Sequence, residues 1–223
     1  DKAFYKFALQ QINKETTKEK PWFAALVTSG THSPFNIPEQ YKPHIQNNHH
    51  RAFSYADEAI KELFDDLKAM QLLENTVIII TGDESRAFSP KNSPIYRDLI
   101  LNWLPLIIIT PDKDQKQIED IRSLIDLQKT IVNYIGEDIS NIHGRSGFIE
   151  YTGRKPIIFG NIYRNQIFLL KENNIIQKCN ALTSLCIDIQ YNPKNLFKDD
   201  YEIISEKPYF SSEIQHIIKE NDI

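Results

Sequence analysis

Apolar residues recur at three- and four-residue spacing in three parts of this chain, which predicts three helices. The first is expected over residues 2–13. The second and clearest covers residues 53–70, where charged side chains fill the opposite face. The third is expected to open at Ser123, whose spacing to Asp126 fits a capping box, and to stop at Gly136.

Continuous apolar runs predict buried strands between these helices. They occupy residues 22–28 (WFAALVT), 76–81 (TVIIIT) and 104–109 (LPLIII). Strands that are apolar on both sides are typical of parallel sheets covered by helices on both faces. The alternation of such strands with helices therefore predicts an α/β fold.

The pattern changes after Gly153. Short strands alternate there with turn residues such as Asn173-Asn174, which predicts an antiparallel meander, and a last helix is expected from Ser211 or Ser212. We therefore expect two domains: a mostly parallel sheet flanked by helices over residues 1–150, and a small antiparallel β-sheet with a terminal helix over residues 151–223.

Composition narrows the functional classes. The 223 residues carry a formal net charge of −4, with no run of Lys and Arg that would favour a nucleic-acid partner. No apolar run is long enough to cross a bilayer. The two cysteines, Cys179 and Cys186, fit neither a zinc motif nor a redox pair. They fit a disulfide in an exported protein and two buried thiols equally well.

Polar side chains gather in two loops that follow predicted strands. His32 lies in the loop after residues 22–28, and Asp83, Glu84 and Arg86 follow residues 76–81. Ligands of open α/β sheets bind at the carboxyl ends of strands, so we expect His32 and Asp83 to line one crevice. Spacing alone, however, is more typical of a polar turn than of a metal site.

Each of these side chains has chemistry suited to an anionic substrate. Asp83 and Glu84 offer hard oxygen ligands for Mn²⁺, Mg²⁺ or Ca²⁺. His32 can donate to an anionic oxygen or exchange a proton near neutral pH. Arg86 can hold a phosphate or sulfate through two parallel hydrogen bonds.

The order of motifs resembles the alkaline phosphatase superfamily, on its branch of sulfatases and membrane-anchored phosphoglycerol transferases such as lipoteichoic acid synthase. The resemblance covers roughly residues 20–150 and the C-terminal half of that catalytic domain. It rests on six stretches in sequence: AALVTSGTHSPF, SYADEAIKELF, TVIIITGDES, LPLIIITP, RSLIDLQ and GRSGF.

The resemblance implies roles for individual residues. Asp83 corresponds to the metal-binding aspartate of the family's Gly-Asp-His motif, and His32 to the histidine that contacts the phosphate or sulfate group. It implies a divalent cation, Mn²⁺ or Mg²⁺, and a phosphate- or sulfate-ester substrate that can be lipid-linked. It also implies an extracytoplasmic location, with membrane anchoring through an N-terminal segment outside this chain.

The chain departs from the family pattern in three places. Glu84 stands where the family has histidine, and Leu124 stands where the helix motif carries histidine. The family's nucleophile belongs to a region upstream of the first helix, so no catalytic nucleophile is assigned here and the chain alone is expected to be inactive.

Four interpretations remain at this stage. The first is part of a transferase of phosphoglycerol or phosphoethanolamine head groups, and the second is a sulfuric or phosphoric ester hydrolase of the same superfamily. The third is a non-catalytic domain that has lost the metal site, which Glu84 and Leu124 favour. The fourth is an unrelated α/β domain.

Overall fold

The computed structural model describes most of the chain and divides it into two compact units. The described residues are 1–18, 20–42, 44–85, 100–112, 118, 121–137, 142, 144–148, 157–161, 165–192, 201–207, 212, 214 and 215. The first unit comprises Asp1–Ile80 with Leu106–Gln115, and the second comprises Thr81–Pro105 with Lys116–Ile223. The predicted domain boundary at residue 150 stays a prediction.

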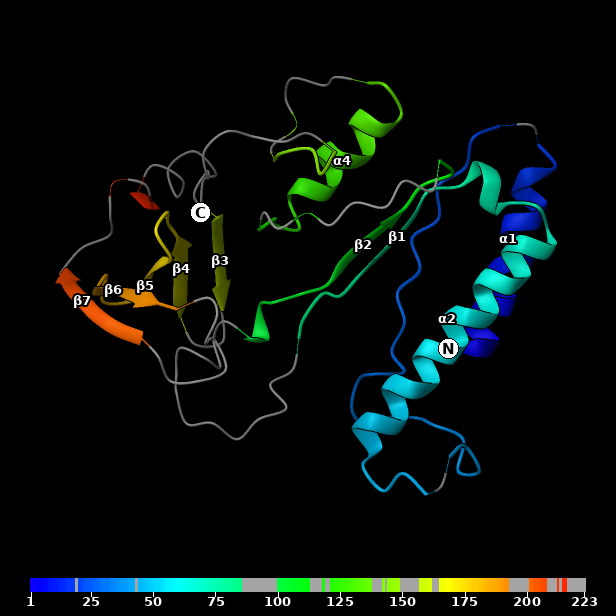
Figure 1. Cartoon of the computed structure of the whole chain (residues 1–223), viewed down its shortest axis with the longest axis horizontal. Coiled ribbons are helices and arrows are strands. Elements are labelled where there is room, and N and C mark those ends of the chain that lie inside the picture. The colour runs from blue at the N-terminus through cyan, green and yellow to red at the C-terminus, as the bar shows by residue number, and fades with distance from the viewer. Residues whose placement is uncertain are drawn as a thin grey trace. The chain divides into compact units, whose positions relative to one another are not determined.

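Two helices form the frame of the first unit (Figure 1). Helix α1 (Lys2–Thr16) and helix α2 (Asn48–Ala69) confirm the first two predicted helices and extend both. The amide of His50 donates to the Asn47 side chain at 3.2 Å, and this N-cap sets the start of α2 five residues before the expected one. The apolar stripes bury small residues such as Ala8 and Ala59, which lets helices approach closely.

A short 3-10 helix, η1 (Leu73–Asn75), leads from α2 into strand β1 (Ile78–Thr81), which pairs with strand β2 (Leu106–Ile109). Both strands were expected. The strand expected over residues 22–28 is wrong for this structure, because these residues lie in neither a helix nor a strand. A strand exists only through hydrogen bonds to a neighbour, and no such neighbour is present among the described residues.

The second unit holds the expected antiparallel meander. Five strands follow one another in sheet order: β3 (Ile157–Asn161), β4 (Gln166–Leu170), β5 (Ile175–Asn180), β6 (Cys186–Tyr191) and β7 (Tyr201–Lys207). Asn173 and Asn174 both have positive φ, at 58° and 57°, and form the two-residue turn between β4 and β5. Asparagine tolerates this backbone conformation, so the local sequence fixes the register of this hairpin.

Both faces of this sheet are covered. On one face Phe168, Leu170 and Ile176 pack together with Ile157. The other face buries Leu169 against the cysteine pair and Ile214 of the C-terminal helical residues, as the alternation of side chains along a strand requires. The side chain of Ile214 is fully buried.

The two cysteines form a disulfide across neighbouring strands. Cys179 of β5 and Cys186 of β6 are direct partners in the register, and both side chains are fully buried. The sequence left open whether the cysteines form a disulfide or remain two buried thiols, and the structure shows the disulfide. The bond joins β5 to β6 on the face of the sheet against which Ile214 packs.

A buried carboxylate ties together strands of the same sheet. Asp188 accepts hydrogen bonds from Gln177 at 2.8 Å and from Ser205 at 2.9 Å. Burial alone would raise the pKa of Asp188. The hydrogen bonds and nearby positive charge outweigh burial and lower the pKa below its usual value, through Ser205, Lys207, Gln177 and Lys171.

The third predicted helix is α4 (Asp126–Tyr134), and Gly136 stops it with a φ of 82°. The side chain of Asp126 accepts from the Ser123 amide at 2.9 Å, which is the acidic half of the expected capping box. None of the helices in the described ranges combines the length and apolar character that a bilayer-spanning segment needs.

Removal of the disulfide should destabilise the second unit by about 2–3 kcal/mol, because the bond constrains the unfolded chain across a separation of seven residues. The double variant Cys179→Ala, Cys186→Ala should therefore unfold at lower urea concentration than the oxidised protein. A reducing agent should lower the midpoint of the unchanged protein and leave that of the double variant where it is. Equal midpoints for oxidised and reduced protein would contradict this role.

Candidate active site

His32 lies at the solvent-exposed tip of a loop that precedes α2 (residues 29–42, the His32 loop). Two backbone turns shape this tip. The His32 amide donates to the Ser29 carbonyl at 3.0 Å, and the Phe35 amide donates to the His32 carbonyl at 2.8 Å. The exposed position agrees with a substrate-binding role, which needs an accessible ring.

The ring of His32 is oriented by its own loop. Nδ1 lies 2.6 Å from the Ser33 carbonyl oxygen. A carbonyl only accepts, so Nδ1 carries the hydrogen and the neutral ring presents the lone pair of Nε2 outward. Nε2 has no hydrogen-bond partner within the described ranges. It can take up a proton or, once protonated, donate to an anionic oxygen.

Arg51, in the first turns of α2, holds the His32 loop in place by binding the backbone carbonyls of the loop. Its guanidinium donates to three loop carbonyls at 2.9–3.2 Å, those of Tyr41, Pro38 and Glu39. The ring of Phe35 also packs on His49, with centroids 4.3 Å apart. A loop without regular structure needs donors for its carbonyls, and one arginine fork supplies several of them.

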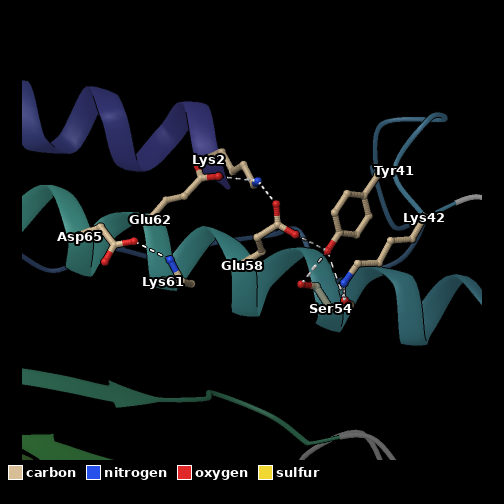
Figure 2. Close-up of polar contacts among 8 residues, drawn as sticks. All are labelled: Lys2, Tyr41, Lys42, Ser54, Glu58, Lys61, Glu62 and Asp65. Atoms are coloured by element: carbon tan, nitrogen blue, oxygen red, sulfur yellow. Dashed lines mark hydrogen bonds and ion pairs between the residues drawn. The ribbon is translucent and has the colours of Figure 1, made fainter.

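Glu58 joins this loop to both helices (Figure 2). One carboxylate oxygen accepts from Lys2 of α1 at 2.5 Å, and the other accepts from the Tyr41 hydroxyl at 2.9 Å. Lys2 also donates to Glu62 at 2.7 Å. We call these four residues the Glu58 network. It links α1, α2 and the His32 loop through a single carboxylate.

The electrostatics of the network follow from these contacts. The hydrogen bond from Lys2, followed by that from Tyr41, lowers the pKa of Glu58. The hydrogen bonds to Glu58 and Glu62 raise the pKa of Lys2. Glu58 therefore stays ionised and Lys2 stays protonated through the physiological pH range, and the ion pair between them persists there.

Asp83 and Glu84 form the turn that leaves β1. The Asp83 carboxylate accepts from the Glu84 amide at 2.8 Å through Oδ1, and both side chains are exposed. The turn is fastened to residues 101–105: the Ser85 amide donates to the Leu101 carbonyl at 3.0 Å, and Thr81 Oγ1 donates to the Pro105 carbonyl at 2.9 Å.

This turn has donors that fit a hard cation, although the described residues do not complete a ligand set. The amide of Glu84 orients Asp83, and Oδ2 of Asp83 has no hydrogen-bond partner within the described part of the chain. Among the described residues no group of three or more His, Cys, Asp or Glu side chains converges on one point. Further ligands would have to come from elsewhere.

Two motifs at the end of the family resemblance meet in the second unit. Asp126 accepts the Arg145 amide at 2.7 Å, and Thr130 Oγ1 accepts the Gly147 amide at 2.8 Å. Gly144 has a φ of 103°, and a Cβ there would lie 2.7 Å from the Ile125 carbonyl oxygen. The GRSGF turn is therefore built onto the start of α4, beside which Leu124 is exposed.

Of the four predicted site residues, the structure describes His32, Asp83 and Glu84. His32 belongs to the first unit and the Asp83-Glu84 turn to the second, so their common crevice stays a prediction. Arg86 and its predicted anion-binding role lie outside the described residues. Asp83 and Glu84 are brought together by their turn, and their metal-binding role likewise stays a prediction.

Sequence reasoning missed Arg51 and Glu58, which hold the His32 loop. Periodicity assigns Glu58 to the charged face of α2, and nothing local marks it as special. Arg51 carries a faint signal: it directly follows an irregular, proline-rich loop whose carbonyls need donors.

Tyr41→Phe should loosen the His32 loop, because it removes the only side-chain hydroxyl that joins the loop to Glu58 in the described contacts. Hydrogen exchange of the loop amides should become severalfold faster. Lys61→Ala is the matched control on α2: it breaks the exposed pair with Asp65, which does not touch the loop, and should leave exchange unchanged. Equal exchange in the protein and in Tyr41→Phe would show that the network does not hold the loop.

The curated proteins that this chain resembles include lipoteichoic acid synthases from two bacteria. Lipoteichoic acid synthase from Staphylococcus aureus (strain USA300) is 25% identical over an alignment that covers 89% of this chain and 34% of the relative. Lipoteichoic acid synthase 1 from Bacillus subtilis (strain 168) is 26% identical, over 62% of this chain and 24% of the relative. The chain thus spans about a third or less of the length of these proteins.

A solved structure has the same fold. It is a crystal structure of a protein in the alkaline phosphatase superfamily from Vibrio parahaemolyticus, with a TM-score of 0.73 and 21% identity. The match covers 96% of this chain and 50% of the other chain. This chain therefore has an α/β fold of the alkaline phosphatase superfamily.

The family model described as Sulfatase matches residues 1–137 of this chain. The matched stretch contains the His32 loop, the Glu58 network and the Asp83-Glu84 turn. It covers more than half of the 223 residues, and the chain belongs to the sulfatase family.

Proposed function

We propose that this chain is the C-terminal part of the catalytic domain of a metal-dependent phosphotransferase that acts on lipid or glycan head groups of the cell envelope. Phosphoglycerol or phosphoethanolamine would be the transferred group. One observation carries the proposal: the similarity to lipoteichoic acid synthase covers 89% of the chain, which is more than the 137 residues of the family match. The similarity therefore extends beyond the motifs that all sulfatases share.

The disulfide supports an extracytoplasmic location. Disulfides persist in oxidising compartments and are rare in the cytosol. The Cys179–Cys186 bond is buried at the centre of the antiparallel sheet, where it belongs to the fold. We propose that the protein acts outside the cytoplasm and is held at the membrane by a segment outside these residues.

Each side chain is assigned a role in this proposal. His32, with Nδ1 engaged by Ser33, would use Nε2 to bind a phosphate oxygen. Asp83, with Oδ1 engaged by the Glu84 amide, would offer Oδ2 to Mn²⁺ or Mg²⁺. Arg86 would hold the same anionic group. The cation would activate a Ser or Thr nucleophile, supplied upstream, and offset charge on the transferred group.

Glu84 sets the character of this proposed site. A carboxylate in place of the family's histidine keeps a ligand for a hard cation but adds one negative charge. An anionic substrate would be repelled unless a cationic side chain compensates. Arg86, two residues further along the chain, is the nearest candidate in sequence.

The second candidate function is hydrolysis of sulfuric or phosphoric esters, because the matching family model is described as Sulfatase. Transfer and hydrolysis differ only in the acceptor, which is a lipid or glycan hydroxyl in one and water in the other. A non-catalytic role is the third candidate. It is favoured by Glu84 and by the exposed, non-ligating side chain of Leu124.

The full-length protein, supplied with Mn²⁺ and a lipid that carries a phosphoglycerol head group, should release diacylglycerol and extend an acceptor. Isothermal titration should show Mn²⁺ binding, which Asp83→Ala weakens by about 100-fold or more, since loss of a ligand exceeds loss of a supporting contact. Asp57→Ala, which removes an exposed carboxylate of α2, is the control and should bind Mn²⁺ normally.

Two further variants sharpen this test. Glu84→His should lower the KM for the anionic substrate, because it removes the additional negative charge that would repel the substrate. The 223-residue chain alone should turn over neither phosphate nor sulfate esters. Release of free glycerol phosphate without extension of an acceptor would favour the hydrolase instead. Undiminished Mn²⁺ binding by Asp83→Ala would contradict the assignment of the metal site.

A further inference from the structure

The turn between β5 and β6 (residues 180–185, the hairpin tip) presents two leucines to solvent. Leu182 is 76% exposed and Leu185 is 49% exposed. Ala181 and Thr183 are exposed beside them, and residues 179–187 carry no charged side chain. Turns at the surface are usually built from polar residues, so an uncharged tip with two exposed leucines points to an interaction surface.

The backbone amides of the hairpin tip are all paired within the protein. The amides of residues 180–185 donate to the Leu185 carbonyl, the Asn165 carbonyl, both oxygens of Asn180 and the Thr183 hydroxyl, at 2.7–3.4 Å. Asn180 accepts three of these six amides, two at its side-chain oxygen and one at its carbonyl. An unpaired amide is costly in an apolar phase. The tip can therefore leave water without carrying unpaired amides with it.

The base of the tip is held by the disulfide. Cys179 and Cys186 close the hairpin directly behind residues 180–185, and both side chains are fully buried in the sheet. Binding by a segment that is already fixed in shape loses little conformational freedom. The sheet therefore presents the two leucines on a firm support.

The charges of the neighbouring strands begin only below the tip. The nearest charged residues along β5, β6 and β7 are two basic and two acidic ones: Lys178, Lys207, Asp188 and Glu206. Lysine side chains commonly bury their stems in apolar surroundings and keep the ammonium group in the headgroup layer. An uncharged tip above charges of both signs matches the division of a bilayer into an uncharged acyl region and a charged headgroup layer.

The size of the apolar tip favours a lipid surface over a protein partner. A stable protein interface buries about 800 Å² on each partner, and two leucine side chains supply only a fraction of that area. Contact with acyl chains needs no complementary shape and gains from each apolar side chain that leaves water. Two leucines bind a bilayer weakly, so the tip would act on a protein that is already held at a membrane, and this step rests on the proposed function.

We propose that the hairpin tip inserts Leu182 and Leu185 into the boundary between headgroups and acyl chains of a bilayer, and so orients the antiparallel sheet at the membrane surface. The hydroxyl of Thr183 and the charges below the tip keep the insertion shallow. Because the charges below the tip are of both signs, a neutral bilayer of phosphatidylcholine is sufficient for insertion.

The test uses the full-length protein with vesicles of phosphatidylcholine that is brominated on its acyl chains, because bromine quenches indole fluorescence only at short range. The Leu182→Trp variant should gain an emission component, relative to the unchanged protein, that these vesicles quench by at least about half. Ile135→Trp is the matched control, since Ile135 is 67% exposed in the same unit. The emission that this control gains should not be quenched.

A second experiment removes the apolar character of the tip. The double variant Leu182→Asp, Leu185→Asp should keep the thermal midpoint of the unchanged protein, because both side chains are exposed. Its KM should rise severalfold for a lipid substrate in vesicles and stay the same for a water-soluble ester of the same head group. The quenching experiment needs no turnover, so it decides the proposal even for a protein that is inactive on both substrates.

Two results would overturn the proposal. Emission of Leu182→Trp that brominated vesicles leave unquenched would show that the tip stays in water. A dimer of the full-length protein that Leu182→Asp dissociates would assign the tip to a second copy of the chain.

Discussion

Completion of sheet hydrogen bonding is the constraint on which this structure depends. The antiparallel sheet meets it within the chain: each strand from β3 to β7 pairs with its neighbours in sequence, and both faces are covered. The first unit does not meet it. Strands β1 and β2 pair only with each other among the described strands, and residues 22–27 pair with nothing described. Within the described residues, the chain thus combines a five-stranded antiparallel sheet with a two-stranded one.

The two loops of the proposed site each follow an apolar segment of the chain. The His32 loop directly follows residues 22–28, and the Asp83-Glu84 turn directly follows β1. Each loop is well held locally, the first by Arg51 and the Glu58 network and the second by residues 101–105. The local structure of each loop is therefore separate from the position of the two loops relative to one another. Each loop is thus ordered within its own unit, and a shared site between the two remains a proposal.

Sequence reasoning succeeded where structure is decided locally. Helix periodicity, the stop at Gly136 and the Asn173-Asn174 turn depend on residues that are adjacent in the chain. It failed where the deciding partner is distant. Residues 22–28 have strand composition but pair with no strand among the described residues. Glu58 gains its role from Lys2 and Tyr41, which lie 56 and 17 residues away. The cysteines remained ambiguous until the register placed Cys179 opposite Cys186.

The central proposal is that His32 and Asp83 belong to one metal-dependent site. The most direct measurement is anomalous X-ray diffraction from crystals of the full-length protein grown with Mn²⁺. A manganese peak at the Asp83 carboxylate, with the His32 imidazole in the same crevice, is the predicted result. Manganese bound elsewhere, or His32 and Asp83 at opposite edges of the sheet, would contradict the account.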